Sequence, residues 1–182
     1  MRNTTSAWGG AARAFHWVLA VLIIGMVAYG YWMNHFAPRT DRFFHRSIHA
    51  DIGYIVLVLT VLRLIWRLFN PAPLLPAGTP RFERAIAHLN HGLLYVLTLI
   101  VVFLGWAHSG AHKPDYASFF GLFRVPQFTS ENREAAGIYE ERHILMAYAL
   151  LALVVVHVLA ALYHHFIRRD TVLTRMVRNL PR

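Results

Sequence analysis

Residues 143–166 read HILMAYALLALVVVHVLAALYHHF, and between Ile144 and Tyr163 this stretch contains no charged residue and a single histidine, His157. A helix needs about 20 predominantly apolar residues to cross the hydrocarbon core of a bilayer. A helix of a soluble bundle would carry one polar face, and this stretch has none. The stretch therefore predicts a membrane-spanning helix.

Three further segments have a similar length and composition. Together with residues 143–166, they give four predicted spans, at about residues 14–33, 49–66, 88–111 and 143–166. The segment 14–33 is longer than a typical signal-peptide core and no small-residue cleavage site follows it, so we expect it to be retained as a span. Four prolines between Pro71 and Pro80 end the second helix and form a stiff connector. We expect an all-α, integral membrane four-helix bundle, built as a single transmembrane domain over residues 1–182.

The composition agrees with a membrane protein, because 57% of the residues are hydrophobic and only 15% are charged. The net charge is +9, but the arginines cluster at the ends of the apolar segments. There they set topology and meet anionic lipid headgroups, so we expect membrane lipid and no nucleic acid as a partner. The absence of cysteine excludes disulfides, iron–sulfur clusters, thiolate ligation and covalent haem attachment. Any metal or cofactor depends on the twelve histidines.

The distribution of Lys and Arg predicts the orientation. Eleven of these residues fall on the side of the N-terminus, the proline-rich connector and the C-terminal tail, against seven on the other side. Cytoplasmic loops carry the excess of positive charge, so both termini are expected in the cytoplasm.

Two histidines on the last span point to two sites. His143 and His157 are fourteen residues apart, which gives azimuths about 40° apart and an axial separation of about 21 Å. With the predicted topology, His16 lies at the depth of His157 near the inner face, and His49 lies at the depth of His143 near the outer face. Two imidazoles facing each other at each depth is the arrangement of bis-histidine b-type haem, which transfers electrons. We therefore expect two non-covalently bound haem b groups.

Residues at the same spacing support this interpretation. Arg63 follows His49 by fourteen residues and faces the inner site, either to pair with a haem propionate or to reach the headgroups by snorkelling. Gly30 follows His16 by fourteen residues, and Gly53 lies one turn after His49. A missing side chain at these positions leaves room for a porphyrin, although glycine is also common where membrane helices pack.

The other histidines have less defined roles. His45, one turn before His49, is the rival ligand for the outer site. Four histidines at the ends of the third span have no opposite partner left, so we expect them at the membrane–water interface: His88, His91, His108 and His112. His164 and His165 lie at the cytoplasmic interface, where they could protonate a bound small molecule.

Several stretches resemble one known family. They include Phe15-His16-Trp17, His49-Ala50-Asp51-Ile52-Gly53 and His88-Leu89-Asn90-His91. The most specific is the end of the chain, from His143 and His157-Val158-Leu159-Ala160-Ala161-Leu162-Tyr163-His164-His165-Phe166 to Arg169-Asp170-Thr171-Val172-Leu173-Thr174-Arg175-Met176. The chain resembles the bacterial di-haem cytochrome b561 family, and within it the superoxide oxidase type, along nearly its whole length.

The resemblance implies a location in the bacterial inner membrane and a reaction. Superoxide, or another periplasmic donor, would give an electron to an outer haem held by His49 and His143. An inner haem held by His16 and His157 would pass it to ubiquinone. His164 matches a position near the quinone site of the family. Lys113, Arg46 and Arg142 could steer a small anion toward the outer face, although loose surface charge is the simpler reading.

Two other functions are compatible with this sequence. The chain could be the haem-bearing membrane anchor of a dehydrogenase or hydrogenase complex, although no obligate protein partner is evident. It could also be a haem-free metal or proton transporter, whose purified protein would be colourless. The first and last spans offer almost no other polar residue to line a transport path.

Overall fold

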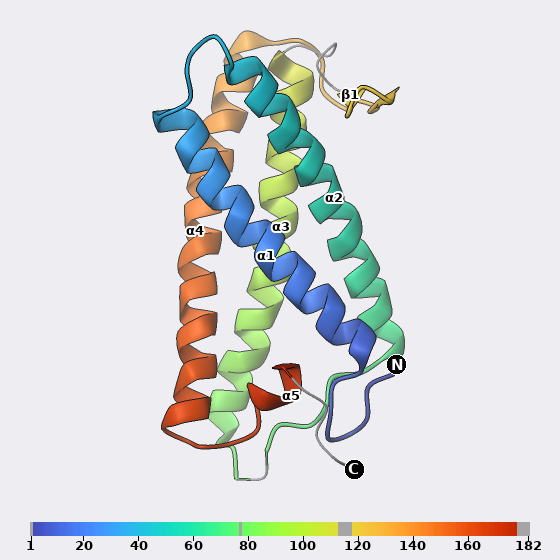
Figure 1. Cartoon of the computed structure of the whole chain (residues 1–182), viewed down its shortest axis with the longest axis vertical. Coiled ribbons are helices and arrows are strands. Elements are labelled where there is room, and N and C mark those ends of the chain that lie inside the picture. Colours follow the sequence, from blue (N-terminus) through green and yellow to red (C-terminus); the bar gives the residue numbers. More distant parts are fainter. Residues whose placement is uncertain (1, 77, 113–117, 178–182) are drawn as a thin grey trace.

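Four long helices make up most of the protein. A computed structural model describes residues 2–76, 78–112 and 118–177 (Figure 1). Each of the four predicted spans lies within one helix, and each helix is long and apolar enough to cross a membrane. The helices are α1 (Gly10–His35), α2 (Arg42–Phe69), α3 (Arg81–His112) and α4 (Arg133–Phe166). The prediction of an all-α four-helix membrane fold is therefore confirmed.

The helices extend beyond the predicted spans. α4 begins ten residues before His143, because Asn132 caps its first turn by accepting a hydrogen bond from the amide of Ala135 at 3.0 Å. α2 ends at Phe69, immediately before Asn70-Pro71. A residue that precedes proline is disfavoured in helical conformation, so the connector begins there.

The four helices run up and down in sequence order (Figure 1). α3 packs along α4, α1 packs on α2 and α2 packs on α3, while α1 and α4 touch little. Because the number of long helices is even, the segment before α1 and the short helix α5 (Thr174–Val177) lie at the same end of the bundle (Figure 1). We call this the inner end and the opposite end the outer end, following the predicted orientation.

The middle of the bundle is closed by small and medium side chains. Val56 of α2, Thr98 of α3 and Leu150 of α4 are buried at mid-height. The hydroxyl of Thr98 donates to the carbonyl of Leu94 at 2.7 Å, so it needs no partner on another helix. This layer separates the two ends of the interior.

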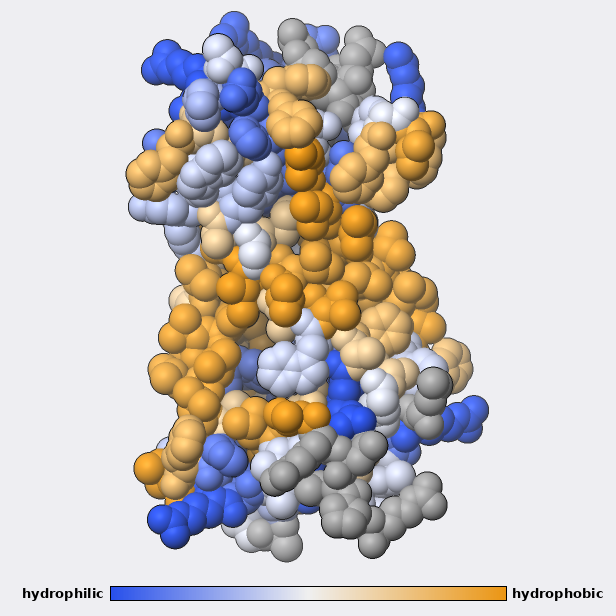
Figure 2. All heavy atoms as spheres, viewed as in Figure 1, coloured by the Kyte–Doolittle hydropathy of each residue, from blue (hydrophilic) through white to orange (hydrophobic). Residues whose placement is uncertain are grey.

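The outward surface of the helices is apolar. Figure 2 shows a band of hydrophobic side chains across the middle of one face, with hydrophilic side chains above and below it. Aliphatic side chains of the membrane-spanning helices, such as Val21 of α1 and Val58 of α2, are more than half exposed. An exposed apolar surface of this extent is suited to lipid contact. The four helices and their apolar outer surface are those of a multi-pass membrane protein.

The connections cover both ends. At the outer end, β1 (Ser118–Phe119) and β2 (Phe123–Arg124) form an antiparallel hairpin in which Ser118 pairs with Arg124 and Phe119 with Phe123. At the inner end, the chain beyond α4 folds back on the bundle. There the indole N–H of Trp17 donates to the carbonyl of Met176 at 2.9 Å, which joins α5 to α1.

Candidate functional site

The outer end brings two of the predicted histidines together. His49 of α2 and His143 of α4 have ring centroids 6.0 Å apart. An imidazole nitrogen binds a metal at about 2.0–2.1 Å, so two imidazoles on opposite sides of one iron have centroids roughly 6 Å apart. The separation of this outer pair therefore fits bis-histidine ligation of one iron.

Hydrogen bonding fixes which ring nitrogen is available at His143. Its Nδ1 lies 2.8 Å from the carbonyl oxygen of Val101, and a carbonyl can only accept, so Nδ1 carries the proton. The Nε2 lone pair of His143 is then free to bind a metal, and the backbone bond holds the ring in place. On the opposite helix, Nδ1 of His49 is buried with no hydrogen-bond partner among the described residues.

Two glycines lie directly against these rings. A Cβ atom added at Gly30 of α1 would lie 3.2 Å from Cε1 of His49, and one added at Gly105 of α3 would lie 3.1 Å from Cε1 of His143. Gly53 lines the same cavity with nothing within 4 Å of an added Cβ. Gly30 and Gly105 therefore make room for the imidazole rings themselves, and Gly53 leaves open space in the cavity where a flat macrocycle could lie.

Gly105 was not predicted, although the sequence contains a signal for it. Gly105 follows His91 by fourteen residues, the same spacing that links His16 to Gly30 and His49 to Arg63. Such a spacing brings two residues to the same helix face at the two levels of the bundle. Applying it to α3 would have found this residue.

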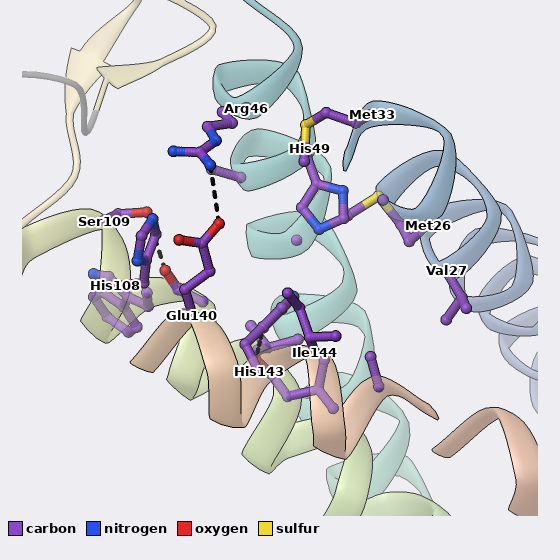
Figure 3. Close-up of a pocket in the computed structure, with 18 of the residues that line it drawn as sticks. Met26, Val27, Met33, Arg46, His49, His108, Ser109, Glu140, His143 and Ile144 are labelled. Atoms are coloured by element: carbon purple, nitrogen blue, oxygen red, sulfur yellow. Dashed lines mark hydrogen bonds and ion pairs between the residues drawn. The ribbon is translucent and has the colours of Figure 1, made fainter. Parts of the chain in front are cut away.

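A cavity of about 450 Å³ surrounds the outer pair. In Figure 3, His49 projects from α2 near Met26 and Met33 of α1, while His143 lies on α4 across the cavity. Mostly apolar walls around two imidazoles suit a haem rather than a hydrated ion.

The charged wall of the cavity differs from the expected anion-steering cluster. Arg46 forms an ion pair with Glu140 at 2.9 Å (Figure 3), so its charge is compensated locally. Arg142 is exposed on α4, and Lys113 lies outside the described residues. An arginine already paired with a carboxylate attracts a small anion less than a lone one does.

The inner end brings together the second predicted pair. The ring centroids of His16 of α1 and His157 of α4 are also 6.0 Å apart. A guanidinium nitrogen of Arg63 lies 3.2 Å from Nδ1 of His16, and the guanidinium carbon lies 5.4 Å from the ring centre of Tyr95. Arg63 is therefore directed into the bundle at the inner pair, where a cation can meet an anionic propionate.

His91 corrects the sequence analysis, which expected it at the membrane–water interface. Its ring centroid is 5.2 Å from that of His157, and its Nδ1 lies 2.7 Å from the carbonyl of Ala87. The expectation was wrong because α3 begins at Arg81 rather than near His88, so His91 is almost three turns inside the helix. The inner pair thus has a third imidazole beside it.

The remaining histidines occupy separate environments. His45, the rival outer ligand, forms a hydrogen bond between its Nδ1 and the hydroxyl of Tyr29 at 2.8 Å. The ring that faces His143 is that of His49, not that of His45. His108 is half-buried and lines the outer cavity, which is a more interior position than the interface expected for it. His112, the last residue of α3, also borders the cavity but is exposed, as expected for an interfacial residue. His88 is exposed on α3, as expected for an interfacial residue.

His164 lies at the inner end of α4 and has a carboxylate partner. Its Nδ1 is 2.5 Å from Oδ2 of Asp170, and both side chains are largely buried. The other oxygen of Asp170 accepts from the amide of Val172 at 3.0 Å, which fixes the carboxylate in the turn after α4. An imidazole held by a fixed carboxylate is suited to moving a proton.

Within the described residues, no group of three or more His, Cys, Asp or Glu side chains is arranged to hold a bare metal ion. The imidazoles oppose each other in pairs, and those of the outer pair border a cavity lined by glycines, which suits an iron whose other four ligands come from a porphyrin. The residues present therefore fit haem b.

Comparison with known proteins agrees with this geometry. The family model described as prokaryotic cytochrome b561 matches residues 7–179. The chain is 34% identical over 179 residues to cytochrome b561 homolog 2 of Escherichia coli K12, covering 96% of this chain and 93% of that protein. It is 29% identical to the probable superoxide oxidase CybB of Yersinia pestis, over 89% of this chain and 90% of that protein. It is also 29% identical to cytochrome b562 of Cereibacter sphaeroides, over 90% of each chain.

A family match over nearly the whole chain, together with opposed imidazoles inside an apolar four-helix bundle, defines the class of the protein. The chain belongs to the prokaryotic cytochrome b561 family, and it is a transmembrane electron-transfer protein that uses haem b.

Proposed function

We propose that the chain transfers electrons from superoxide at the periplasmic face to ubiquinone at the cytoplasmic side, as a single transmembrane unit over residues 1–182 with both termini in the cytoplasm. The observation that carries the proposal is the pair of imidazole layers, with ring centroids 6.0 Å apart in each. The choice of superoxide is supported by the relative from Yersinia pestis, whose name is probable superoxide oxidase.

Four histidines hold two haems in this proposal. His49 and His143 ligate the outer haem iron, and His16 and His157 ligate the inner one. Haem b, when bound, supplies a one-electron carrier at each level. The two levels are about 21 Å apart along the helices, so they divide a crossing of about 30 Å into shorter intervals.

The protein's own residues orient and tune these sites. The carbonyl of Val101 holds the ring of His143, and Gly30 and Gly105 keep side chains away from the imidazole rings. Arg63 supplies a positive charge at the inner pair, where it would balance a propionate. In this arrangement the histidines bind the iron, and the apolar helices around them exclude water from the site.

The two half-reactions place different demands on the two ends. Each superoxide anion gives up one electron and leaves as dioxygen, so the outer end needs no proton donor. Ubiquinone takes two electrons and two protons to become ubiquinol, so the inner end needs a proton source. His164, hydrogen-bonded to Asp170, is the residue we assign to that role.

Haem content tests the assignment of the ligands. We expect two haems per chain in the purified protein, and one in each of the variants His16→Ala and His49→Ala, with different haems lost. His88→Ala, which changes an exposed histidine, is the matched control and should retain both haems. One haem in the parent, or loss of the same haem from both variants, would contradict the pairing.

Activity tests the substrates. Purified protein is given superoxide and a soluble quinone analogue, and quinol formation is followed above the uncatalysed background. No quinol above background would remove the superoxide–quinone assignment while leaving the haem assignment intact. Copurification with a soluble dehydrogenase or hydrogenase in that case would indicate a membrane-anchor role instead.

A further inference from the structure

The outer connection between α3 and α4 contains a hairpin with an unusual composition. Residues 118–124 read SFFGLFR, with Arg124 as the only charged residue. The turn has positive φ at Phe120 (46°) and Gly121 (73°), and the amide of Leu122 donates to the carbonyl of Phe119 at 2.8 Å. Positive φ at both central residues is the type I′ turn geometry, and this turn lies within the three-residue loop 120–122 that joins the paired residues Phe119 and Phe123. The hairpin is thus a compact, well-defined element.

Its large side chains point away from the bundle. Phe120 is 49% exposed, Leu122 is 77% exposed and Phe123 is 59% exposed. In Figure 1 the hairpin lies to the side of the outer end of α2, and Figure 2 shows apolar side chains at the same place, next to the apolar band of the helices. The apolar surface of the hairpin therefore continues the lipid-facing surface of the spans.

A buried carboxylate fixes the hairpin to α2. Oδ2 of Asp51 accepts a hydrogen bond from the amide of Phe120 at 3.1 Å, and Asp51 is only 3% exposed. The pairing within the hairpin leaves this turn amide unused, and an unpaired amide outside water is costly. Asp51 satisfies it, which lets the turn lie where water is scarce.

The same hydrogen bond sets the depth of the hairpin. Asp51 is two residues after His49, about 3 Å further along the helix axis. Two histidine layers about 21 Å apart, centred in a hydrocarbon core of about 30 Å, each lie about 5 Å inside the nearer boundary. The backbone of Asp51 is therefore about 8 Å inside this boundary. Because side chains on a helix slant toward its N-terminus, here the outer end, the carboxylate of Asp51 and the hairpin turn bonded to it lie between that depth and the headgroups.

Neighbouring aromatic residues support this depth. The indole N–H of Trp106 donates to the carbonyl of Pro126 at 3.0 Å, and the Trp106 ring packs against Phe128 with centroids 5.0 Å apart. Phe128 is itself exposed. Tryptophan is enriched where a membrane protein passes from acyl chains to headgroups.

We propose that the hairpin 118–124 is a lipid-binding element that inserts Phe120, Leu122 and Phe123 into the interfacial layer of the outer leaflet, and that Asp51 holds it there. The partner is the phospholipid surface itself. The hairpin thereby braces the outer ends of α2 and α3 beside the outer histidine pair. This proposal depends on the membrane fold and not on the identity of the electron donor or acceptor.

The chain has no cysteine, so single-cysteine variants carry one spin label each. We would label Leu122→Cys in the full-length protein, reconstituted in vesicles of phosphatidylethanolamine and phosphatidylglycerol. Power saturation then measures collisions with dioxygen, which partitions into lipid, and with a water-soluble nickel chelate. Val58→Cys, on the exposed face of α2, is the lipid reference, and Ser130→Cys, just before α4, is the aqueous reference.

We expect the label at Leu122 to collide with nickel several-fold less often than the label at Ser130, and with dioxygen nearly as often as the label at Val58. Nickel collisions equal to those at Ser130 would overturn the proposal, because the hairpin would then lie in water. Low collision rates with both reagents would also overturn it, because the hairpin would then be packed against protein.

A second pair of variants tests the anchor. Asp51→Ala removes the acceptor for the Phe120 amide, whereas Asp51→Asn keeps a side-chain oxygen that can accept. In the Leu122→Cys protein, Asp51→Ala should increase the mobility of the label and its nickel collisions, and Asp51→Asn should leave both close to the parent. Equal spectra in the two variants would refute the role of Asp51. The depth measurement on Leu122→Cys uses native Asp51, so it holds even if Asp51→Ala folds poorly.

Discussion

Replacing Gly105 by alanine places a methyl group directly against the ring of His143. The added Cβ would lie 3.1 Å from Cε1 and 3.2 Å from Nδ1, which is tighter than ordinary contact. The opposite constraint is the bond from Nδ1 to the carbonyl of Val101, now 2.8 Å long. Because such bonds extend to about 3.2 Å, the ring can move by roughly 0.4 Å before the bond is lost. The methyl group of alanine should push the ring within this range, whereas valine, with two more methyl groups, should push it further and break the bond.

These displacements translate into haem affinity at the outer pair. A hydrogen bond of this type contributes about 0.5–1.5 kcal/mol, so Gly105→Ala should weaken retention of the outer haem by up to about tenfold. Overpacking by valine costs about 1–3 kcal/mol, which corresponds to about 5- to 150-fold. The inner haem, about 21 Å away along the helices, should be unaffected.

The assay is the rate of haem transfer from the purified protein to excess apomyoglobin, followed by absorbance. We expect one of two kinetic phases to accelerate in the order parent, Gly105→Ala, Gly105→Val. Gly92→Ala is the matched control on the same helix, because an added Cβ there meets nothing within 4 Å. Parental release from Gly105→Val, or equally fast release from Gly92→Ala, would refute the steric argument.

Three further predictions follow from the inner end. Arg63→Ala removes a positive charge beside the inner pair, so it should lower the reduction potential of the inner haem by about 40–90 mV, equivalent to about 1–2 kcal/mol for a one-electron couple. Arg63→Lys keeps the charge and should lower the potential less. Equal shifts of both haems in a redox titration would contradict the position of Arg63. Asp170→Asn should slow quinol formation by roughly tenfold or more with both haems retained, because His164 loses its carboxylate partner, and an unchanged rate would exclude this role. Reporter fusions should place the C-terminus in the cytoplasm: a C-terminal green fluorescent protein should fluoresce, and a C-terminal alkaline phosphatase should be inactive. Active phosphatase would refute the predicted topology.

The sequence was sufficient for features that depend on one helix at a time. Length and hydropathy identified the four spans, because an apolar stretch of this length has few alternatives to crossing a membrane. The fourteen-residue spacing of His143 and His157 set two levels on one face, because the pitch of an α-helix fixes both rotation and rise. Matching the depths of His16 and His49 to these levels needed only the alternating direction of the spans.

Features that depend on contacts between elements needed the tertiary structure. The true start of α3 placed His91 beside His157, and the packing of α3 against α4 placed Gly105 against His143. The hydrogen bond between Asp51 and Phe120 joins residues 69 positions apart, and no local pattern indicates it. Helix periodicity specifies the direction of a side chain relative to its own axis. The rotation of each helix relative to its neighbours, and the path of the loops between them, are decided only when all the side chains pack together.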